Sequence, residues 1–338
     1  MKEIKLGIIG SNFVADWMCD SIDKTDGIAN HAIFSRTAER GNEFAARHNI
    51  PNVYTNLEDF LSSDIDAVYI ASPNFLHAPY SVAAMDHGLH VIVEKPAALS
   101  EAEFVLMEEA AERNGVVLME AMRPIHDPAI KVIRGAMKEI GTIRRASFEF
   151  CQYSSRYDRF KAGEIMNAFD PSLGNAALMD IGVYAVACMV YLLGGKPDSI
   201  YSKSVILHNG MEGMGSIFLD YGSAQAEVVY SKITESYNPS SITGEDGTIL
   251  IGKLSTLENV RLCRRLKNTG NGQNDTSEET IAVSGDQNNM IFEAADFVKL
   301  IRGGCSEGGV WNRITRESLR IMDEVRRQSG IVFPGVNI

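Results

Sequence analysis

The first 120 residues alternate short apolar runs with helical patterns, and this alternation constrains the fold more than any other feature of the sequence. The strand-like runs lie at residues 4–9, 31–34, 67–71, 90–93 and 116–119. Helical patterns lie between them, near residues 13–24, 37–48, 78–87 and 101–113. Apolar strands that alternate with helices form βαβ units, so this part of the chain is predicted to be a doubly wound parallel sheet.

The last of these helices is marked at both ends. Ser100 and Glu103 have the spacing of a capping box, and Leu99 with Phe104 has the spacing of the matching hydrophobic staple. Gly115 supplies a stop signal at the other end. The sequence therefore predicts where this helix begins and where it ends.

The pattern changes after Arg123. Helical patterns lie near 128–139, 176–193, 290–302 and 314–328. Strand-like runs lie at 143–153, 199–207, 215–221, 224–232, 248–252, 258–264 and 279–283. Most of these strands follow one another with no helix between them, which predicts an antiparallel sheet.

Two domains are expected from this division and from the length of 338 residues. Residues 1–122 are predicted to form an α/β domain with a doubly wound parallel sheet. Residues 123–338 are predicted to form an α+β domain with a mainly antiparallel sheet. The polar stretch 266–278 is predicted to be a hairpin loop.

The charge of the chain excludes some classes of partner. The chain has 44 Asp and Glu against 32 Lys and Arg, a formal net charge of −12, which disfavours nucleic acids and anionic membranes. The acidic excess lies in the first 120 residues, which hold 19 acidic and eight basic side chains. Basic residues are scarce there, so those at the ends of strands are candidates for a specific task.

Cysteine usage and apolar stretches bear on the compartment. The five cysteines are scattered and lack CxxC spacing: Cys19, Cys151, Cys188, Cys263 and Cys305. Neither a disulfide framework nor a metal site is expected. Asp180 interrupts the longest apolar stretch and leaves 13 uncharged residues, too few to span a bilayer. The N-terminal residues lack the features of a signal peptide, so we expect a soluble cytoplasmic protein.

The first strand runs into a turn that is typical of dinucleotide binding. Gly10, Ser11, Asn12 and Phe13 connect this strand to the first helix, whose N-terminal N–H groups suit a pyrophosphate. Asn12 stands where the usual pattern has a second glycine, so its side chain is expected to crowd the phosphate. A plain strand–turn–helix junction accounts for the same residues.

The end of the second strand indicates which dinucleotide is preferred. NAD-binding folds place an acidic residue about 20 residues past the turn, where it bonds the ribose 2′-hydroxyl. Ser35 and Arg36 stand near that position here, and a hydroxyl beside a guanidinium suits a 2′-phosphate. We therefore expect NADP in preference to NAD, although a solvated loop arginine remains the alternative.

Two further segments follow strands at the edge where doubly wound sheets bind ligands. Ser72, Pro73, Asn74 and His77 follow the third apolar run; turn chemistry and a helix start also explain them. The Glu94-Lys95-Pro96 triplet follows the fourth run. Its charged pair fits either a structural salt bridge or a catalytic lysine.

The apolar helix at 176–193 carries two polar side chains. Asp180 and Tyr184 are four residues apart and therefore share one face of this helix. A buried acid needs a partner, so the pair is either a satisfied core contact or part of a site.

Taken together, Glu94-Lys95-Pro96 and Asp180-x-Gly182-x-Tyr184 carry a resemblance to a known family. The chain resembles the Gfo/Idh/MocA family of NAD(P)-dependent oxidoreductases over essentially its whole length. The turn at Gly10, the segment 72–77, Glu120-Ala121-Met122-Arg123 and the C-terminal ESLRIMDEVRRQSGIVFP also match. Tyr184 stands where many members have histidine. In this respect the chain resembles the branch of the family that holds glucose–fructose oxidoreductase and the dimeric dihydrodiol dehydrogenases.

The resemblance implies a fold and an assembly. It implies a Rossmann domain followed by a domain with a large, open, mainly antiparallel sheet. That sheet often forms the subunit interface in the family, so a homodimer or homotetramer is expected. The cofactor-binding residues implied are then those of the turn at Gly10, the pair Ser35 and Arg36, and Ser72, Pro73, Asn74, His77, Glu94 and Lys95.

The resemblance also implies a chemistry. Hydride passes between a carbinol carbon and nicotinamide while the hydroxyl proton moves to a base. Tyr184 is the expected acid/base, because a lysine ammonium favours the phenolate. Lys95 stabilises the developing oxyanion, and Asp180 orients the substrate or Lys95.

A sugar, a cyclic polyol or a vicinal diol is the expected substrate. Candidate contacts are Arg123, His126, Tyr153, Arg156, Tyr157 and Asn167. A catalytically silent NAD(P)-binding sensor of the same fold is the alternative function, and the intact trio of Lys95, Asp180 and Tyr184 disfavours it.

Overall fold

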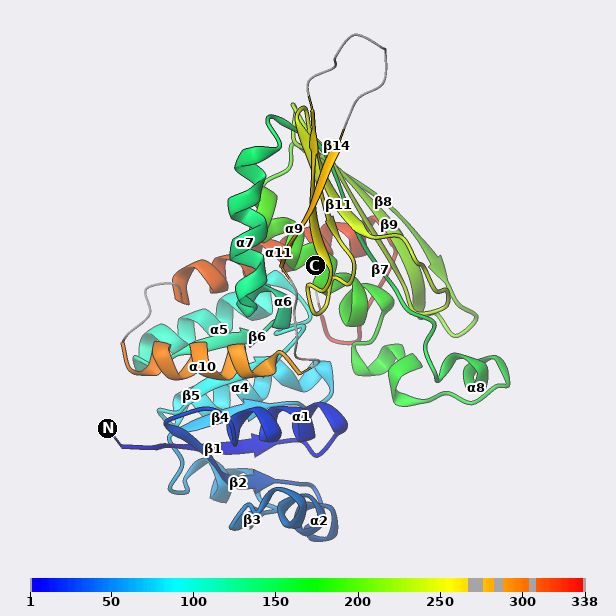
Figure 1. Cartoon of the computed structure of the whole chain (residues 1–338). Coiled ribbons are helices and arrows are strands. Elements are labelled where there is room, and N and C mark those ends of the chain that lie inside the picture. The colour runs from blue at the N-terminus through cyan, green and yellow to red at the C-terminus, as the bar shows by residue number, and fades with distance from the viewer. Residues whose placement is uncertain (1, 267–275, 283–287, 304–307, 337–338) are drawn as a thin grey trace. The chain divides into compact units, whose positions relative to one another are not determined.

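The computed structural model describes residues 2–266, 276–282, 288–303 and 308–336 and divides the chain into two compact units (Figure 1). The first unit contains the chain up to Met122 and Asn288–Leu319; the second contains Arg123–Gln287 and Arg320–Val336. Most of the loop expected at 266–278 lies outside the described residues, as does Cys305.

The first unit is built on a six-stranded sheet in the order β3-β2-β1-β4-β5-β6. All of its neighbouring strands pair in parallel. The strands are β1 (Ile4–Ile9), β2 (Ile28–Phe34), β3 (Asn52–Tyr54), β4 (Ala67–Ile70), β5 (His90–Glu94) and β6 (Leu118–Ala121). The doubly wound Rossmann sheet predicted from the sequence is thus confirmed. Its strand order reverses between β1 and β4, where such sheets bind ligands.

Helices cover this sheet. They are α1 (Phe13–Ile22), α2 (Ala38–His48), α3 (Leu57–Leu61), α4 (His77–Asp86), α5 (Glu101–Asn114), α10 (Met290–Ile301) and the first part of α11 (Gly308–Ser329). Buried side chains of α3, α4 and α5 share one hydrophobic cluster with the strands. Residues 288–319, which the sequence analysis assigned to the second domain, belong to this unit because α10 packs against α1 and β6.

The end signals of α5 act as the sequence predicts. Ser100 Oγ accepts the N–H of Glu103 at 3.2 Å, and the Glu103 carboxylate accepts the N–H of Leu99 at 2.9 Å. Gly115 ends the helix with a φ of 63°. Strand β3 and helix α3 were not predicted, because their three and five residues are too few to show a periodic pattern.

The second unit is built on an eight-stranded sheet in the order β14-β13-β12-β11-β7-β10-β9-β8. The strands are β7 (Ile143–Cys151), β8 (Ser199–Ile206), β9 (Glu212–Asp220), β10 (Gln225–Ser231), β11 (Ser240–Gly244), β12 (Gly247–Ile251), β13 (Val260–Arg265) and β14 (Thr276–Ala282). Every neighbouring pair is antiparallel except β7 and β10, which run parallel at the centre. The mainly antiparallel sheet is therefore confirmed.

Two of the helical segments, α9 and η5, pack on the central strands β7 and β10 of this sheet (Figure 1). The helical segments are α6 (Arg123–His126), α7 (Pro128–Ala136), η2 (Met137–Glu139), α8 (Tyr157–Lys161), η3 (Asn167–Phe169), η4 (Pro171–Leu173), η5 (Leu178–Gly182) and α9 (Val183–Leu193). In β10, Ala226, Val228 and Tyr230 are buried, whereas the alternate residues from Gln225 to Val229 are not. This alternation places the core between the sheet and α9, and leaves the other face open.

Candidate functional site

The turn after β1 lies where the strand order of the parallel sheet reverses. Gly10 has a φ of +113°, and a Cβ there would lie 2.4 Å from the carbonyl oxygen of Ala71. Only glycine is accommodated at this close approach of two strand ends. The close packing of this turn against the end of β4 therefore requires a glycine.

Asn12 makes three hydrogen bonds at this turn. Its Oδ1 accepts the N–H groups of Val14 and Ala15 at 3.0 Å each, and its Nδ2 donates to the Ala71 carbonyl at 3.0 Å. Asn12 is thus the N-cap of α1, and its side chain is held between that helix and the end of β4. Ser11 and Phe13 on either side are exposed, and the ring of Phe13 contacts Trp17 edge-on at 5.4 Å.

Ser35 and Arg36 follow β2 at the same edge of the sheet. Ser35 is 8% exposed, and its amide donates to the Tyr54 carbonyl at 3.0 Å. Arg36 is exposed, and Thr37 caps the start of α2 next to it. Ser35, Arg36 and the N-terminus of α2 therefore follow one another at the strand end where an NAD-binding fold has a carboxylate.

His77 links two of the predicted segments. Its Nδ1 lies 2.8 Å from the Pro96 carbonyl and its Nε2 lies 2.9 Å from the Ser72 carbonyl. Burial is the largest effect on its pKa, which falls below the ordinary value. His77 is 1% exposed, so it ties the loop after β4 to the loop after β5. Pro73 precedes a short 3-10 turn, Asn74–Leu76, that presents Asn74 beside this link.

Lys95 is the one residue between 91 and 100 that is not buried. The preceding Glu94 ends β5 and accepts the hydroxyl of the fully buried Tyr69 at 2.6 Å. The carboxylate of Glu120 accepts the Ala97 N–H at 2.8 Å just after the lysine. Two buried acids therefore support the loop that presents the Lys95 side chain.

Asp180 lies in a π-helical turn, η5, which leads into α9. Asp180 and Tyr184 are the two residues between 178 and 190 that are not buried. The sequence predicted an α-helix here; the structure inserts a π-turn, which is frequent at functional sites. The ring of Tyr184 contacts Phe150 of β7 edge-on at 5.5 Å.

Strands β9 and β10 pack against this π-helical turn. Glu212 accepts the Leu178 N–H at 2.9 Å. A Cβ on Gly182 would lie 3.0 Å from the ring of Tyr230, which explains the glycine of the Asp-x-Gly-x-Tyr motif. Lys232 forms an ion pair with Asp180, with 2.8 Å between Nζ and Oδ2. The sequence analysis missed Lys232, although it continues the buried phase of the β10 run, where a lysine is unusual.

The remaining substrate candidates fall into two groups. Arg123 and His126 lie on α6, which packs against α9; His126 is buried and Arg123 is partly exposed. Tyr153 donates to Asp158 at 2.7 Å, and Tyr157 stacks on Phe169 at 5.7 Å. Arg156 precedes α8 and is partly exposed.

Asn167 is exposed at the start of η3, and its backbone is held by a second asparagine. The Nδ2 of Asn175 donates to the Asn167 carbonyl at 2.6 Å. This contact fixes the segment that leads into the aromatic cluster around Phe169.

The buried carboxyl group of Glu212 is expected to make the stability of the protein depend on pH. Burial raises the pKa of Glu212 to about 7 from its ordinary 4.5. The unfolded chain therefore releases this proton first as the pH rises. The stability that the neutral carboxyl contributes is present below about pH 4.5 and is lost by about pH 7. Between about pH 4.5 and pH 7 the free energy of unfolding is expected to fall about 3 kcal/mol less in Glu212→Gln than in the wild type.

Denaturant unfolding at a series of pH values measures this effect. The exposed Glu109→Gln is the control, and it should keep the wild-type slope. If the free energy of unfolding depends on pH equally in Glu212→Gln and the wild type, the pKa of the Glu212 carboxyl is not raised by folding.

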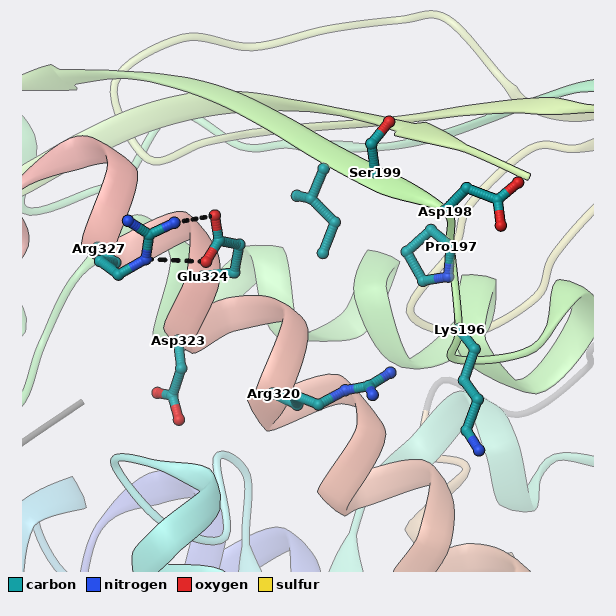
Figure 2. A pocket seen from close by; sticks show the side chains of 9 residues that line it. Lys196, Pro197, Asp198, Ser199, Arg320, Asp323, Glu324 and Arg327 are labelled. Carbon is teal, nitrogen blue, oxygen red and sulfur yellow. Dashed lines mark hydrogen bonds and ion pairs between the residues drawn. The ribbon is translucent and has the colours of Figure 1, made fainter. Parts of the chain in front are cut away.

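A groove of about 530 Å³ is lined by residues 196–200, which follow the end of α9, and by side chains of α11 (Figure 2). It contains three basic and three acidic side chains, Lys196, Arg320, Arg327, Asp198, Asp323 and Glu324. Glu324 and Arg327 pair with each other across a distance of 2.9 Å, as Figure 2 shows. The groove holds none of the predicted site residues.

Two absences concern the part of the chain that the structure describes. No group of three or more His, Cys, Asp and Glu side chains within it could hold a metal ion. No helix within the described ranges is both long and apolar enough to cross a membrane.

Two family models match the chain and decide its classification. Residues 4–122 match an oxidoreductase family with an NAD-binding Rossmann fold, and residues 135–250 match the GFO/IDH/MocA C-terminal domain. The chain belongs to the Gfo/Idh/MocA family. The resemblance inferred from the motifs is therefore confirmed, and the protein is an oxidoreductase of this family.

Individual Gfo/Idh/MocA relatives agree with this assignment. Scyllo-inositol 2-dehydrogenase (NADP(+)) IolU of Bacillus subtilis (strain 168) is 41% identical over 98% of both chains. Trans-1,2-dihydrobenzene-1,2-diol dehydrogenase of Xenopus laevis is 27% identical over 90% of both. A crystal structure of KijD10, a 3-ketoreductase from Actinomadura kijaniata, in complex with NADP and TDP-benzene has a TM-score of 0.80 at 21% identity. It covers 97% of this chain and 98% of its own, and shows the shared fold.

Proposed function

We propose that this protein is an NADP-dependent dehydrogenase that oxidises a ring hydroxyl of a cyclic polyol. The 41% identity to a scyllo-inositol 2-dehydrogenase (NADP(+)), which extends over 98% of both chains, carries this proposal. Sugars and vicinal diols are the neighbouring substrate classes, because a dihydrodiol dehydrogenase is among the more distant relatives. We assign the cofactor to residues 1–122 and the substrate to the second part of the chain.

The residues of the first unit suit a dinucleotide. At Gly10 a Cβ would meet the Ala71 carbonyl, and this tight glycine turn lies where the strand order reverses, as in folds that bind a dinucleotide. Asn12 is the N-cap of α1, and the N-terminus of this helix favours negative charge. Ser35 and Arg36 would hold the 2′-phosphate of NADP.

Three side chains are assigned to the reaction. When bound, the nicotinamide cofactor supplies the hydride acceptor for alcohol oxidation. Tyr184 takes the proton of the substrate hydroxyl through its phenolic oxygen. Lys95 places a positive charge on the substrate oxygen as negative charge develops there. Asp180 accepts a hydrogen bond from the substrate and thereby orients it.

Replacing Arg36 tests the cofactor preference. Arg36→Ala is expected to raise the Kd for NADP about 10- to 100-fold, because a hydrogen bond to a charged group contributes about 1.5–3 kcal/mol. The Kd for NAD should change little, since NAD lacks the 2′-phosphate. Fluorescence titration with both cofactors measures this. Arg113→Ala, on α5 and paired with Asp86, is the control. Equal weakening of both cofactors would assign Arg36 to a general role in the fold.

A substrate panel tests the function itself. The purified protein is mixed with NADP and with scyllo-inositol, other inositols, aldoses or vicinal diols, and the absorbance of reduced cofactor is followed. The highest kcat/KM is expected for a cyclic polyol. A protein that binds NADP and reduces it with no member of the panel would instead be a cofactor-binding sensor.

We further propose a homodimer or homotetramer that forms through the open face of the eight-stranded sheet. Tyr201 and Phe218 are opposite each other on β8 and β9 there, and are 64% and 41% exposed. Val205 lies on the same face of β8, beyond Lys203, and is 47% exposed. Apolar strips of this kind mark contact surfaces. Light scattering in solution tests the assembly, and a monomeric mass would contradict it.

The four described cysteines are free, which supports the reducing cytoplasm as the location of the protein.

A further inference from the structure

Lys232 is a buried cation that the proposed chemistry does not use. It is 2% exposed and follows the last residue of β10. Ala226, Val228 and Tyr230 precede it at every second position, and all three belong to the buried face of the strand. Lys232 continues this phase, in which an ammonium group is costly unless it is paired and hydrogen-bonded.

The Lys232 ammonium has three contacts. Its Nζ lies 2.8 Å from Asp180 Oδ2 and donates to the Ala168 carbonyl at 2.9 Å. It also lies 5.1 Å from the centre of the Phe169 ring. The Asp180 side chain remains 40% exposed, so its carboxylate is held from the buried side while a ligand can still reach it.

The backbone of Lys232 is fixed on both sides. Its N–H donates to the Gly213 carbonyl and its carbonyl accepts the Ser154 N–H, each at 2.9 Å. Strand β10 also carries Tyr230, whose ring lies against Gly182 in the same π-turn. The lysine therefore extends from the rigid centre of the sheet to the turn that bears Asp180 and to η3, where the segment 153–170 ends.

We propose that Lys232 is a positioning residue of the substrate site. Its ammonium holds the Asp180 carboxylate and the Asn167–Phe169 turn in one arrangement, so that Asp180 presents its accessible side to the substrate. Lys232 does not touch the substrate, and it acts through Asp180. This inference rests on the proposed dehydrogenase function, in which Asp180 orients the substrate hydroxyl.

A double-mutant cycle tests the inference. Lys232→Met removes the charge and keeps the length of the side chain, while the 40% exposure of Asp180 allows water to solvate its carboxylate. Lys232→Met is expected to lower kcat/KM for the polyol about tenfold or more and to leave the KM for NADP unchanged. In an Asp180→Asn background the same change should lower kcat/KM less than about threefold, because the effects of substitutions within one network are not additive.

The controls separate this role from a general effect on the fold. Lys138→Met, at an exposed lysine of η2, should leave all constants unchanged. A loss from Lys232→Met that persists in full in the Asp180→Asn background would overturn the inference, as would wild-type kcat/KM in Lys232→Met. If Lys232→Met does not fold, Lys232→Arg decides. It should keep kcat/KM within about tenfold of the wild type, and a loss as large as that of Asp180→Asn would overturn the inference.

Failure of the proposed function would be visible first. A wild-type protein that turns over no polyol, sugar or diol contradicts that function. The Lys232–Asp180 pair is then judged by denaturant unfolding of the same four proteins. Non-additive losses of stability would support the pairing, and additive losses would overturn it.

Discussion

Lys95→Ala is expected to lower kcat by about three orders of magnitude while the protein still binds NADP. Lys95 follows β5 and is the one residue from 91 to 100 that is not buried, and Glu94 and Glu120 support this loop through buried hydrogen bonds. Alanine removes the ammonium that meets the developing negative charge, and loss of one such group costs about 10²–10³-fold. Steady-state kinetics at saturating polyol and NADP measure the effect.

The cofactor affinity of the same variant identifies the step that is lost. Fluorescence titration should give a Kd for NADP close to that of the wild type, because the proposed role of Lys95 is exerted on the substrate oxygen. Lys24→Ala, at an exposed lysine of the first unit, is the matched control and should keep full activity. Substantial turnover by Lys95→Ala would remove this lysine from the mechanism.

Tyr184→Phe is expected to lower kcat about 10²- to 10⁴-fold, the range that one acid/base group contributes. The substitution removes only the hydroxyl, so the ring should keep its edge-on contact with Phe150 and the fold should be unaffected. The measurement is kcat with a saturating alcohol substrate. Tyr237→Phe, at a side chain that is 93% exposed, is the control. A mild effect of Tyr184→Phe would transfer the proton role to Lys95.

Local signals predicted much of the fold. The capping box of Ser100 and Glu103 and the stop at Gly115 set the ends of α5, because these contacts form within a few residues of the chain. The alternation of strands and helices predicted the parallel sheet for a similar reason. The parallel pairing of β7 with β10 could not be predicted, because the residues between them say nothing about which strands become neighbours.

The candidate site was predictable in a different way. The residues Lys95, Asp180 and Tyr184 were found because their motifs resemble those of a family, and their catalytic roles remain predictions. Asn12 shows the limit of such reasoning. A side chain at the position of a glycine suggested crowding, but its hydrogen bonds to Val14, Ala15 and Ala71 depend on where the end of β4 lies.

By itself, the sequence determined the two types of sheet, the family and the identity of the residues with candidate chemical roles, because periodicity and motifs are properties of neighbouring residues. Only the tertiary structure decided the partners of these residues. The pairing of Lys232 with Asp180 joins positions 52 residues apart, and the link from His77 to Pro96 joins two separate strand ends. A buried charge or ring takes whichever partner the folded chain brings within hydrogen-bond distance, and no local pattern records that choice.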